Sequence, residues 1–289
     1  MPNTAIAPPN PLNYSILSSF EWVMSKKRDI PVFNYPIIET HCHLDYLKEA
    51  ELSEVLAGAQ AVGVEKIVTI AVSPDNLKTV RDLTAHDMIF GTQGVHPHDA
   101  EKFTEQTALE IREYGASRKM VAIGEIGLDY FYDHADRAIQ RKVFEEQLAI
   151  AVELDQPIVV HTREADADTQ AILKNFASHL KRKGVIHSFT SGLPLAEFCL
   201  NEGFMLGFNG IITFNKAENV RDVLRATPIE QLVVETDAPY LTPAPYRGRQ
   251  NESKYLPFII EKIAEVKELS VEVVLEQSYA NAQRLFHYQ

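Results

Sequence analysis

Two histidines stand one residue apart, His41 and His43, shortly after the apolar run YPII at residues 35–38. Side chains at positions i and i+2 of a β-strand share one face, so both imidazoles can reach the same metal ion. Taken alone, the pair is more typical of two polar residues that end a strand. The interpretation depends on whether other metal-binding side chains gather at the same place.

Four further residues of this kind each follow a short apolar run. They are Glu125 in AIGEIGLDY, His161 in VVHTRE, His187 in VIHSFTSG and Asp237 in VVETDAPYLTP. By itself, a histidine at a strand end is commonly a hydrogen-bonded core residue, and a carboxylate often caps a turn or helix. Four imidazoles and two carboxylates together exceed one open zinc site. They suit two ions about 3.5–4 Å apart, and Zn²⁺, Mn²⁺ or Mg²⁺ would accept these donors.

The elements that must position these residues alternate along the chain. Eight short apolar runs, typical of strands buried on both faces of a parallel sheet, span residues 36–41, 66–72, 88–93, 120–125, 157–161, 184–188, 204–209 and 231–236. Segments with helical periodicity span residues 50–62, 75–86, 103–116, 134–155, 163–181, 193–202, 216–226, 253–268 and 270–286. Ser270 is the expected N-cap of the last helix.

This alternation predicts an α/β protein with the (β/α)8 TIM-barrel fold. An open doubly wound sheet is the alternative. No GxGxxG sequence follows the first predicted strand, so the dinucleotide-binding form of that alternative has no support. Catalytic groups of a TIM barrel lie at the carboxyl ends of the strands, where all six candidate ligands would then meet.

The barrel is predicted over residues 35–289, after an N-terminal extension at residues 1–34. The start of the extension is rich in proline and asparagine and should be irregular. Apolar residues with helical spacing follow it, at Ile16, Leu17, Phe20, Val23 and Met24. We expect this short helix to pack on the barrel, and an arm that binds a partner is the alternative.

Composition excludes several classes of function. The chain has 289 residues, two cysteines and a net charge of −12, so it has no disulfide framework and no bulk attraction for nucleic acid. Recognition of phosphate must therefore be local or use bound cations. No secretion signal and no run of about 20 apolar residues is present. We predict a cytoplasmic protein without a membrane segment, and no stable protein partner is indicated.

Five further residues are predicted to contact substrate at the active end of the barrel: His96, His98, Arg163, Arg247 and Arg249. The two histidines lie in GVHPHDA, and they could instead hydrogen-bond the metal ligands from behind or simply be polar surface residues. Arg163 follows His161 by two residues. An arginine there could clamp an oxyanion or form a salt bridge at the start of a helix. Arg247 and Arg249 form a local basic patch in PYRGRQNESK, or else a solvated loop. Cys42 should face away from the metals because both of its neighbours face them.

Six segments in order resemble the TatD family of metal-dependent deoxyribonucleases, which are amidohydrolase-like metal barrels: ETHCHLD, GVHPHDA, AIGEIGLDYF, VVHTREA, HSFTSG and VVETDAPYLTPAPYRGRQNES. The resemblance extends over about residues 36–287. It implies a centre of two or three metal ions that hydrolyses phosphodiester bonds in DNA, often from the 3′ end. Glu39 stands where aspartate is common, and Ser188 and Ser191 stand where cysteine and glycine often occur. None of these departures removes a ligand.

The resemblance also implies a role for each ligand. One ion would be bound by His41, His43 and Asp237, the other by His161 and His187, with Glu125 bridging the two. The catalytic residues would be Glu125 and Asp237, the latter handling the proton of the attacking water. The expected activity is a 3′–5′ exodeoxyribonuclease on single-stranded DNA or 3′ ends, using a hydroxide that bridges two divalent ions. The alternatives are an amide or ester hydrolase, such as a D-aminoacyl-tRNA deacylase or a small-molecule amidohydrolase, and a non-catalytic metal-binding protein.

Overall fold

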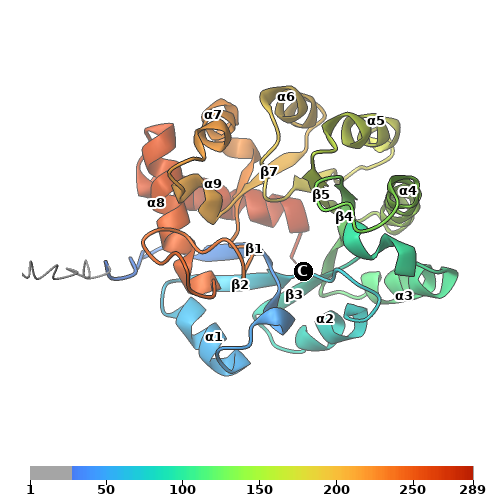
Figure 1. The fold of residues 1–289 in the computed structure, drawn as a ribbon. Helices are drawn as coiled ribbons and strands as arrows, with labels where there is room; N and C mark the ends of the chain where they lie inside the picture. Colours follow the sequence, from blue (N-terminus) through green and yellow to red (C-terminus); the bar gives the residue numbers. More distant parts are fainter. Residues whose placement is uncertain (1–27, 289) are drawn as a thin grey trace, which may run out of the picture.

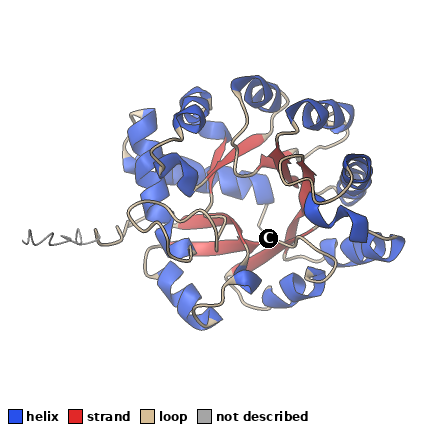
Figure 2. Cartoon of the chain, in the orientation of Figure 1, coloured by secondary structure: helices blue, strands red, loops and turns tan. Residues whose placement is uncertain are grey.

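A ring of parallel strands forms the centre of the molecule, and helices surround it (Figures 1 and 2). The computed structural model describes residues 28–288. The strands follow one another around the sheet in chain order. They are β1 (Ile37–Cys42), β2 (Val64–Thr69), β3 (Ile89–Gln93), β4 (Met120–Asp129), β5 (Ile158–Arg163), β6 (Gly184–Ile186), β7 (Met205–Phe208) and β8 (Leu232–Val234). A parallel bridge from Cys42 to Ala238 links β1 to the segment after β8. The predicted TIM barrel is confirmed.

The helices lie outside the ring at the places that the periodicity predicted (Figure 2). They are α1 (Leu52–Gln60), α2 (Leu77–Leu83), α3 (Glu105–Gly115), α4 (Arg137–Leu154), α5 (Asp166–Phe176), α6 (Leu193–Asn201), α7 (Glu218–Ala226), α8 (Leu256–Lys267) and α9 (Val271–Phe286). Short 3₁₀ helices are η1 (Leu44–Tyr46), η2 (Pro97–Lys102), η3 (Gly210–Thr213), η4 (Ile229–Gln231) and η5 (Ser253–Tyr255). Ser270 caps α9 as predicted, since its hydroxyl accepts a hydrogen bond from the amide of Val273.

Strand β4 extends four residues beyond its predicted end at Glu125 because it keeps pairing with β5. Gly127 lies opposite His161, and Asp129 lies opposite Arg163. Gly127 has a φ of 139°, and a Cβ atom there would lie 2.0 Å from the carbonyl oxygen of His161. Glycine is therefore required for this close approach. The approach brings Glu125 and His161 together. Because the pairing extends to Arg163, α5 begins at Asp166 and not at the predicted residue 163.

The inside of the barrel is filled by apolar side chains from successive strands. Val68 and Val159 belong to this interior cluster, which Phe286 closes at the end of α9. The ring centroids of Phe90 and Tyr288 lie 4.7 Å apart, and Figure 1 shows the C-terminus on the barrel axis. The amino-terminal end of the barrel is thereby plugged, so the chemistry belongs to the carboxyl ends of the strands.

The first described residues run along the outside of the barrel before β1. The Arg28 guanidinium donates hydrogen bonds to both carboxylate oxygens of Glu261 in α8, at 2.8 and 2.6 Å. The helix predicted near residues 16–24 lies outside the described residues, and the domain division at residue 34 stays a prediction. Between residues 28 and 288, none of the helices has the length and apolar character needed to cross a membrane. The cytoplasmic location stays a prediction.

Candidate metal centre

The six predicted ligands meet at the carboxyl ends of the strands. His41 lies in β1 and His43 just after it, Glu125 lies in β4, His161 in β5, His187 just after β6 and Asp237 after β8. Their donor atoms form overlapping groups within 4.8 Å, among them His41 with His43 and Glu125, and His41 with His187 and Asp237. The fold thus brings together residues that lie up to 196 positions apart in the sequence, between positions 41 and 237.

The carboxylate of Glu125 divides the site into two halves. Its Oε2 atom lies 3.4 Å from Nε2 of His41 and 4.0 Å from Nε2 of His43. Its Oε1 atom lies 3.0 Å from Nδ1 of His161 and 2.8 Å from Nε2 of His187. A carboxylate that presents one oxygen to each pair of imidazoles has the arrangement of a ligand shared by two ions.

Asp237 faces the half that contains the first two histidines. Its Oδ1 atom lies 3.5 Å from Nε2 of His43 and 3.7 Å from Nε2 of His41. Asp237 has a φ of 58°, a left-handed conformation that aspartate tolerates better than most residues. Its amide donates a hydrogen bond to the carbonyl of His41 at 2.9 Å. These constraints hold the carboxylate against the histidine pair.

His96 joins the other half, although the sequence indicated a substrate contact or a residue that supports the ligands from behind. Its Nε2 atom lies 3.4 Å from Oε1 of Glu125, and it forms a third possible metal-binding group with Glu125 and His161. Its Nδ1 atom accepts a hydrogen bond from the amide of His98 at 3.1 Å, so Nε2 is the nitrogen that faces the cluster. Position and orientation therefore make His96 a candidate ligand.

Buried ring nitrogens without hydrogen bonds indicate that the cluster fits metal ions. Both nitrogens of His41 and Nδ1 of His187 are buried and have no hydrogen-bond partner in the described part of the chain. An unsatisfied buried polar atom costs about 1–3 kcal/mol. A divalent cation on Nε2 of His41 would remove that cost at one atom, and the mixed donors are those that Zn²⁺ and Mn²⁺ accept.

Both carboxylates of the cluster are ionised at neutral pH. Burial opposes the charge on Glu125, but the facing imidazoles of His187 and His96 outweigh it and hold its pKa well below the usual range. Burial also opposes the charge on Asp237, yet the hydrogen bond from His43 holds its pKa below the ordinary value. Burial, together with the neighbouring His187, lowers the pKa of His41. Ionised carboxylates bind metal directly, and the lowered pKa of His41 favours the neutral imidazole that binds metal.

A cavity of about 740 Å³ opens onto the cluster, and His43, Glu125, His161, His187 and Asp237 line part of its wall. Pockets of this size commonly hold small ligands. The wall also includes Tyr132, Arg163 and Tyr240.

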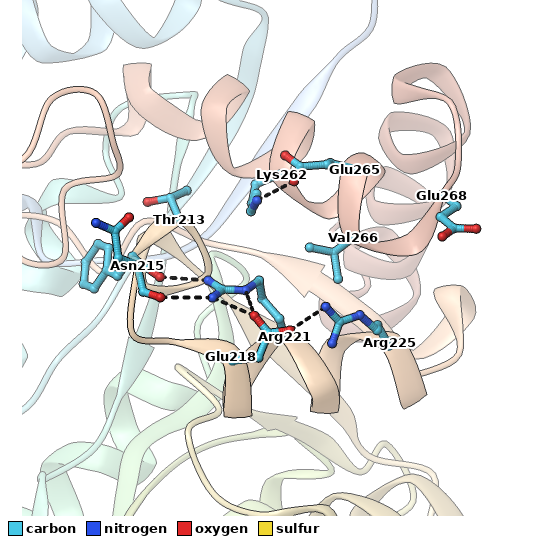
Figure 3. Close-up of a pocket in the computed structure, with 10 residues that line it drawn as sticks. Thr213, Asn215, Glu218, Arg221, Arg225, Lys262, Glu265, Val266 and Glu268 are labelled. Carbon is cyan, nitrogen blue, oxygen red and sulfur yellow. Dashed lines mark hydrogen bonds and ion pairs between the residues drawn. The ribbon is translucent and has the colours of Figure 1, made fainter.

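A second hollow of about 450 Å³ lies outside the barrel, between α7 and α8 (Figure 3). Its arginines are already paired, since Arg221 and Arg225 both contact the carboxylate of Glu218. Lys262 pairs with Glu265. These cations are neutralised, and no metal-binding group of the described residues lies in this hollow. The cavity above the cluster is therefore the candidate active site.

Comparisons with known proteins identify the family. The profile of the family described as TatD related DNase matches residues 38–287. The chain belongs to the TatD family. It is 38% identical over 252 residues to the uncharacterized metal-dependent hydrolase YabD of Bacillus subtilis strain 168, covering 86% of this chain and 98% of that protein. It is 37% identical over 206 residues to the 3′-5′ ssDNA/RNA exonuclease TatD of Erwinia tasmaniensis, covering 70% of this chain and 79% of that protein.

A solved structure agrees with this assignment. YJJV, a TatD homologue from Escherichia coli K12, matches with a TM-score of 0.82 and 30% sequence identity over 87% of this chain and 98% of that chain. Membership of the TatD family confirms the resemblance expected from the motifs and makes the chain a metal-dependent hydrolase.

Two of the three departures from the usual TatD pattern are accommodated by hydrogen bonds beside the cluster. The hydroxyl of Ser188 accepts a hydrogen bond from the side-chain amide of Asn209 at 2.9 Å. The hydroxyl of Ser191 donates to Asp166 at 2.7 Å. Neither serine takes the place of a predicted ligand, and all six predicted ligands lie in the cluster.

The third departure, Glu39, is a fully buried carboxyl group one layer below the cluster. It accepts hydrogen bonds from the amide and hydroxyl of Thr236, at 2.9 and 2.6 Å. Burial nevertheless raises the pKa of Glu39 to about 8. The group is therefore largely protonated near neutral pH, unlike the ligands above it.

Asp129 holds two histidines of this TatD site from behind, and the sequence analysis assigned it no role. Its side chain is fully buried. Its Oδ2 atom accepts hydrogen bonds from Nε2 of His161 at 3.1 Å and from Nε2 of His98 at 2.9 Å. The burial of Asp129 opposes its charge, but these imidazoles hold its pKa well below the usual range. The sequence did offer one indication of this role, because Asp129 lies four residues after Glu125 in the same apolar strand.

Glu235 is a buried carboxylate beside His187, as Asp129 is beside His161. Glu235 was assigned no role from the sequence either. It is fully buried, and its Oε1 atom lies 3.7 Å from Nδ1 of His187. The same oxygen accepts a hydrogen bond from the amide of Ser188 at 2.6 Å. The available signal in the sequence was the position of Glu235 directly after the apolar run of β8.

The predicted substrate contacts divide into two sets. His98 and Arg163 line the cavity of the TatD site. Arg247 and Arg249 are exposed and do not line it. The guanidinium of Arg247 lies 3.4 Å from the ring centre of Phe214, outside the ligand cluster. A role of Arg247 and Arg249 in substrate binding stays a prediction.

Proposed function

We propose that this TatD-family hydrolase cleaves phosphodiester bonds in DNA and removes nucleotides from the 3′ end of a single strand. The supporting observation is the orientation of the Glu125 carboxylate, which directs one oxygen toward each pair of imidazoles at the base of an open cavity. Sites with two ions are common in phosphatases and nucleases. The similar Erwinia tasmaniensis protein carries the name of a 3′-5′ ssDNA/RNA exonuclease.

We infer a centre of two divalent ions. One would be held by His41, His43 and Asp237, and the other by His161 and His187, with Glu125 shared between them. When bound, the ions supply positive charge for the phosphate and lower the pKa of water. They also explain how a chain with a net charge of −12 can act on a polyanion.

Asp237 is the residue of the cluster best placed to accept the proton of the attacking water. Its side chain is 13% exposed, compared with 4% for Glu125, so it borders the cavity. Its lowered pKa keeps it ionised. Both oxygens of Glu125 are directed at imidazoles, which suits a ligand. Asp237 is therefore the general base of the proposal, a role that contributes about 10²–10⁴-fold to a rate.

Arg163 would position the phosphate beside the cluster. It lies at the end of β5, lines the cavity, and has no carboxylate within ion-pair distance among residues 28–288. Its charge is therefore available to an anion. A guanidinium can donate two parallel hydrogen bonds to a phosphate, which would orient the scissile bond above Glu125.

The test begins with protein stripped of metal by a chelator. Mg²⁺, Mn²⁺ or Zn²⁺ is added back singly, and loss of nucleotides from 5′-labelled single-stranded DNA is followed. We expect stepwise shortening from the 3′ end with at least one ion and none without metal. Glu125→Gln, prepared in the same way, should stay inactive with every ion.

The outcome also separates this proposal from the other hydrolases considered. The same preparations are incubated with an aminoacyl ester and with a small amide. Hydrolysis of either one, with DNA left intact under all three ions, would replace the nuclease proposal by an ester or amide hydrolase. Shortening that is equal with and without metal would show that the observed nuclease is a contaminant.

A further inference from the structure

Two large aromatic side chains are left half exposed at the mouth of the cavity. Tyr132 is 50% exposed and Tyr240 is 53% exposed, and both line the cavity. Neither ring is therefore needed to fill the core. Tyr132 follows β4 and Tyr240 follows β8. Because the strands run around the ring in the order β1 to β8, the loops that carry these two residues leave opposite sides of the ring.

Each ring lies directly beside the histidine cluster. The ring centroid of Tyr132 lies 5.4 Å from that of His98, which is hydrogen-bonded to Asp129. The ring centroid of Tyr240 lies 6.2 Å from that of His43. A molecule whose reacting bond sits above the cluster would therefore meet a tyrosine on either side.

Arg163 lies on the same side of the cavity as Tyr132. Its guanidinium carbon lies 4.1 Å from the ring centre of Phe131 and 4.8 Å from that of Tyr132. Cation–π stacking on two rings fixes the guanidinium without neutralising it. The edge of the cavity thus offers aromatic faces and an available cation side by side. Sites that bind single-stranded nucleic acid use this combination, in which bases stack on rings and cations contact phosphates.

We propose that Tyr132 and Tyr240 form a stacking subsite for the unpaired base of the nucleotide at the 3′ end, with Arg163 on the adjacent phosphate. The inference rests on the proposed function, because it places a strand end over the ligand cluster. A base inside a duplex has both faces covered and its edge paired, so it reaches such rings only after unpairing. The subsite would therefore select single strands and frayed ends, with little preference among bases, since every base has a stacking face.

The test compares two ten-nucleotide single strands that differ only at the 3′ end. One strand carries a terminal base, and the other has an abasic sugar there. Phosphorothioate linkages near the 3′ end protect both from cleavage, and a 5′ fluorophore reports binding to the Mn²⁺-loaded protein by anisotropy. The wild type should bind the base-bearing strand about 10-fold more tightly than the abasic strand.

The variants assign that preference to the two rings. Tyr132→Ala and Tyr240→Ala should each reduce the preference for the terminal base, whereas Tyr132→Phe and Tyr240→Phe keep the ring and should retain it. Both side chains are half exposed, so thermal unfolding should be nearly unchanged, which scanning calorimetry checks. Equal binding of the two strands by the wild type would overturn the subsite. The same conclusion follows if both alanine variants keep the wild-type preference.

Failure of the subsite can be distinguished from failure of the proposed function. Unmodified strands that bind with the expected preference but are never shortened would leave the subsite standing and refute the nuclease. Strands that are shortened normally, but with no influence of the terminal base on binding or of either ring on the rate, would refute the subsite alone.

Discussion

Nε2 of His161 donates a hydrogen bond to the buried carboxylate of Asp129 at 3.1 Å, while Nδ1 of the same ring lies 3.0 Å from Glu125. The hydrogen bond to Asp129 fixes the tautomer, because it places the proton on Nε2 and leaves the lone pair of Nδ1 facing the cluster. A carboxylate behind an imidazole also makes the ring a stronger donor to a metal. Asp129 thus orients a candidate ligand without itself lying in the cluster.

The first prediction concerns that carboxylate. Asp129→Asn keeps the size of the side chain but removes its charge, and we expect the affinity for Zn²⁺ or Mn²⁺ to fall by about 10- to 100-fold. Isothermal titration of the chelated protein measures the change. Asp133→Asn is the matched control, because Asp133 makes a surface pair with Arg137. Equal affinities of the Asp129 and Asp133 variants would show that the carboxylate behind His161 is dispensable.

The second prediction compares two neighbours in β1. His41 turns toward the cluster, whereas Cys42 packs in the apolar layer that contains Leu44 and Val55. His41→Ala should therefore lose one bound ion and all activity. Cys42→Ala should keep both, with a loss of about 1 kcal/mol in the free energy of unfolding. Metal content by mass spectrometry and nuclease rates measure the two effects, and similar losses in both variants would contradict the assignment of strand faces.

The third prediction addresses the proton acceptor. In Asp237→Asn the side chain can still approach His43 but no longer accepts a proton at neutral pH. We expect kcat on single-stranded DNA to fall by about 10²–10⁴-fold, with an unchanged circular dichroism spectrum. Metal content is measured on the same sample, so that loss of an ion can be told from loss of the base. Full activity in this variant would rule out the proposed role.

The fourth prediction is a dependence of stability on pH. Burial raises the pKa of Glu39 to about 8, above the ordinary value of 4.5 that holds when the chain is unfolded. The folded state therefore binds more protons between these values, and the free energy of unfolding should fall as pH rises from about 4.5 to about 8. The change is about 5 kcal/mol at most.

Glu39→Gln isolates this contribution, because its side chain is neutral at every pH and its amide oxygen can still accept the hydrogen bond from the backbone amide of Thr236. Urea unfolding of the chelated proteins at pH 6 and pH 9 gives the comparison. Relative to the wild type, the glutamine variant should gain clearly more stability at pH 9 than at pH 6, because the wild type has lost only part of this contribution by pH 6. A difference between the two proteins that does not change with pH would show that Glu39 titrates normally in the folded state.

Local sequence patterns were enough to predict the barrel and to select its six candidate ligands. Strand and helix periods are properties of neighbouring residues, so eight apolar runs and the helices between them could be recognised directly. Strand alternation likewise predicted that His41 faces the barrel axis and that Cys42 faces the helices, as the structure shows.

Only the tertiary structure decided how these segments meet. The length of β4 depends on its register with β5, and that pairing sets Asp129 behind His161. The approach of His96 to Glu125 depends on how the loop after β3 folds over the barrel end. The positions of Tyr132 and Tyr240 across one cavity likewise depend on closure of the ring. Residue types and local spacing thus determined what chemistry this chain can support, whereas contacts between distant segments decided which side chains surround the reacting bond.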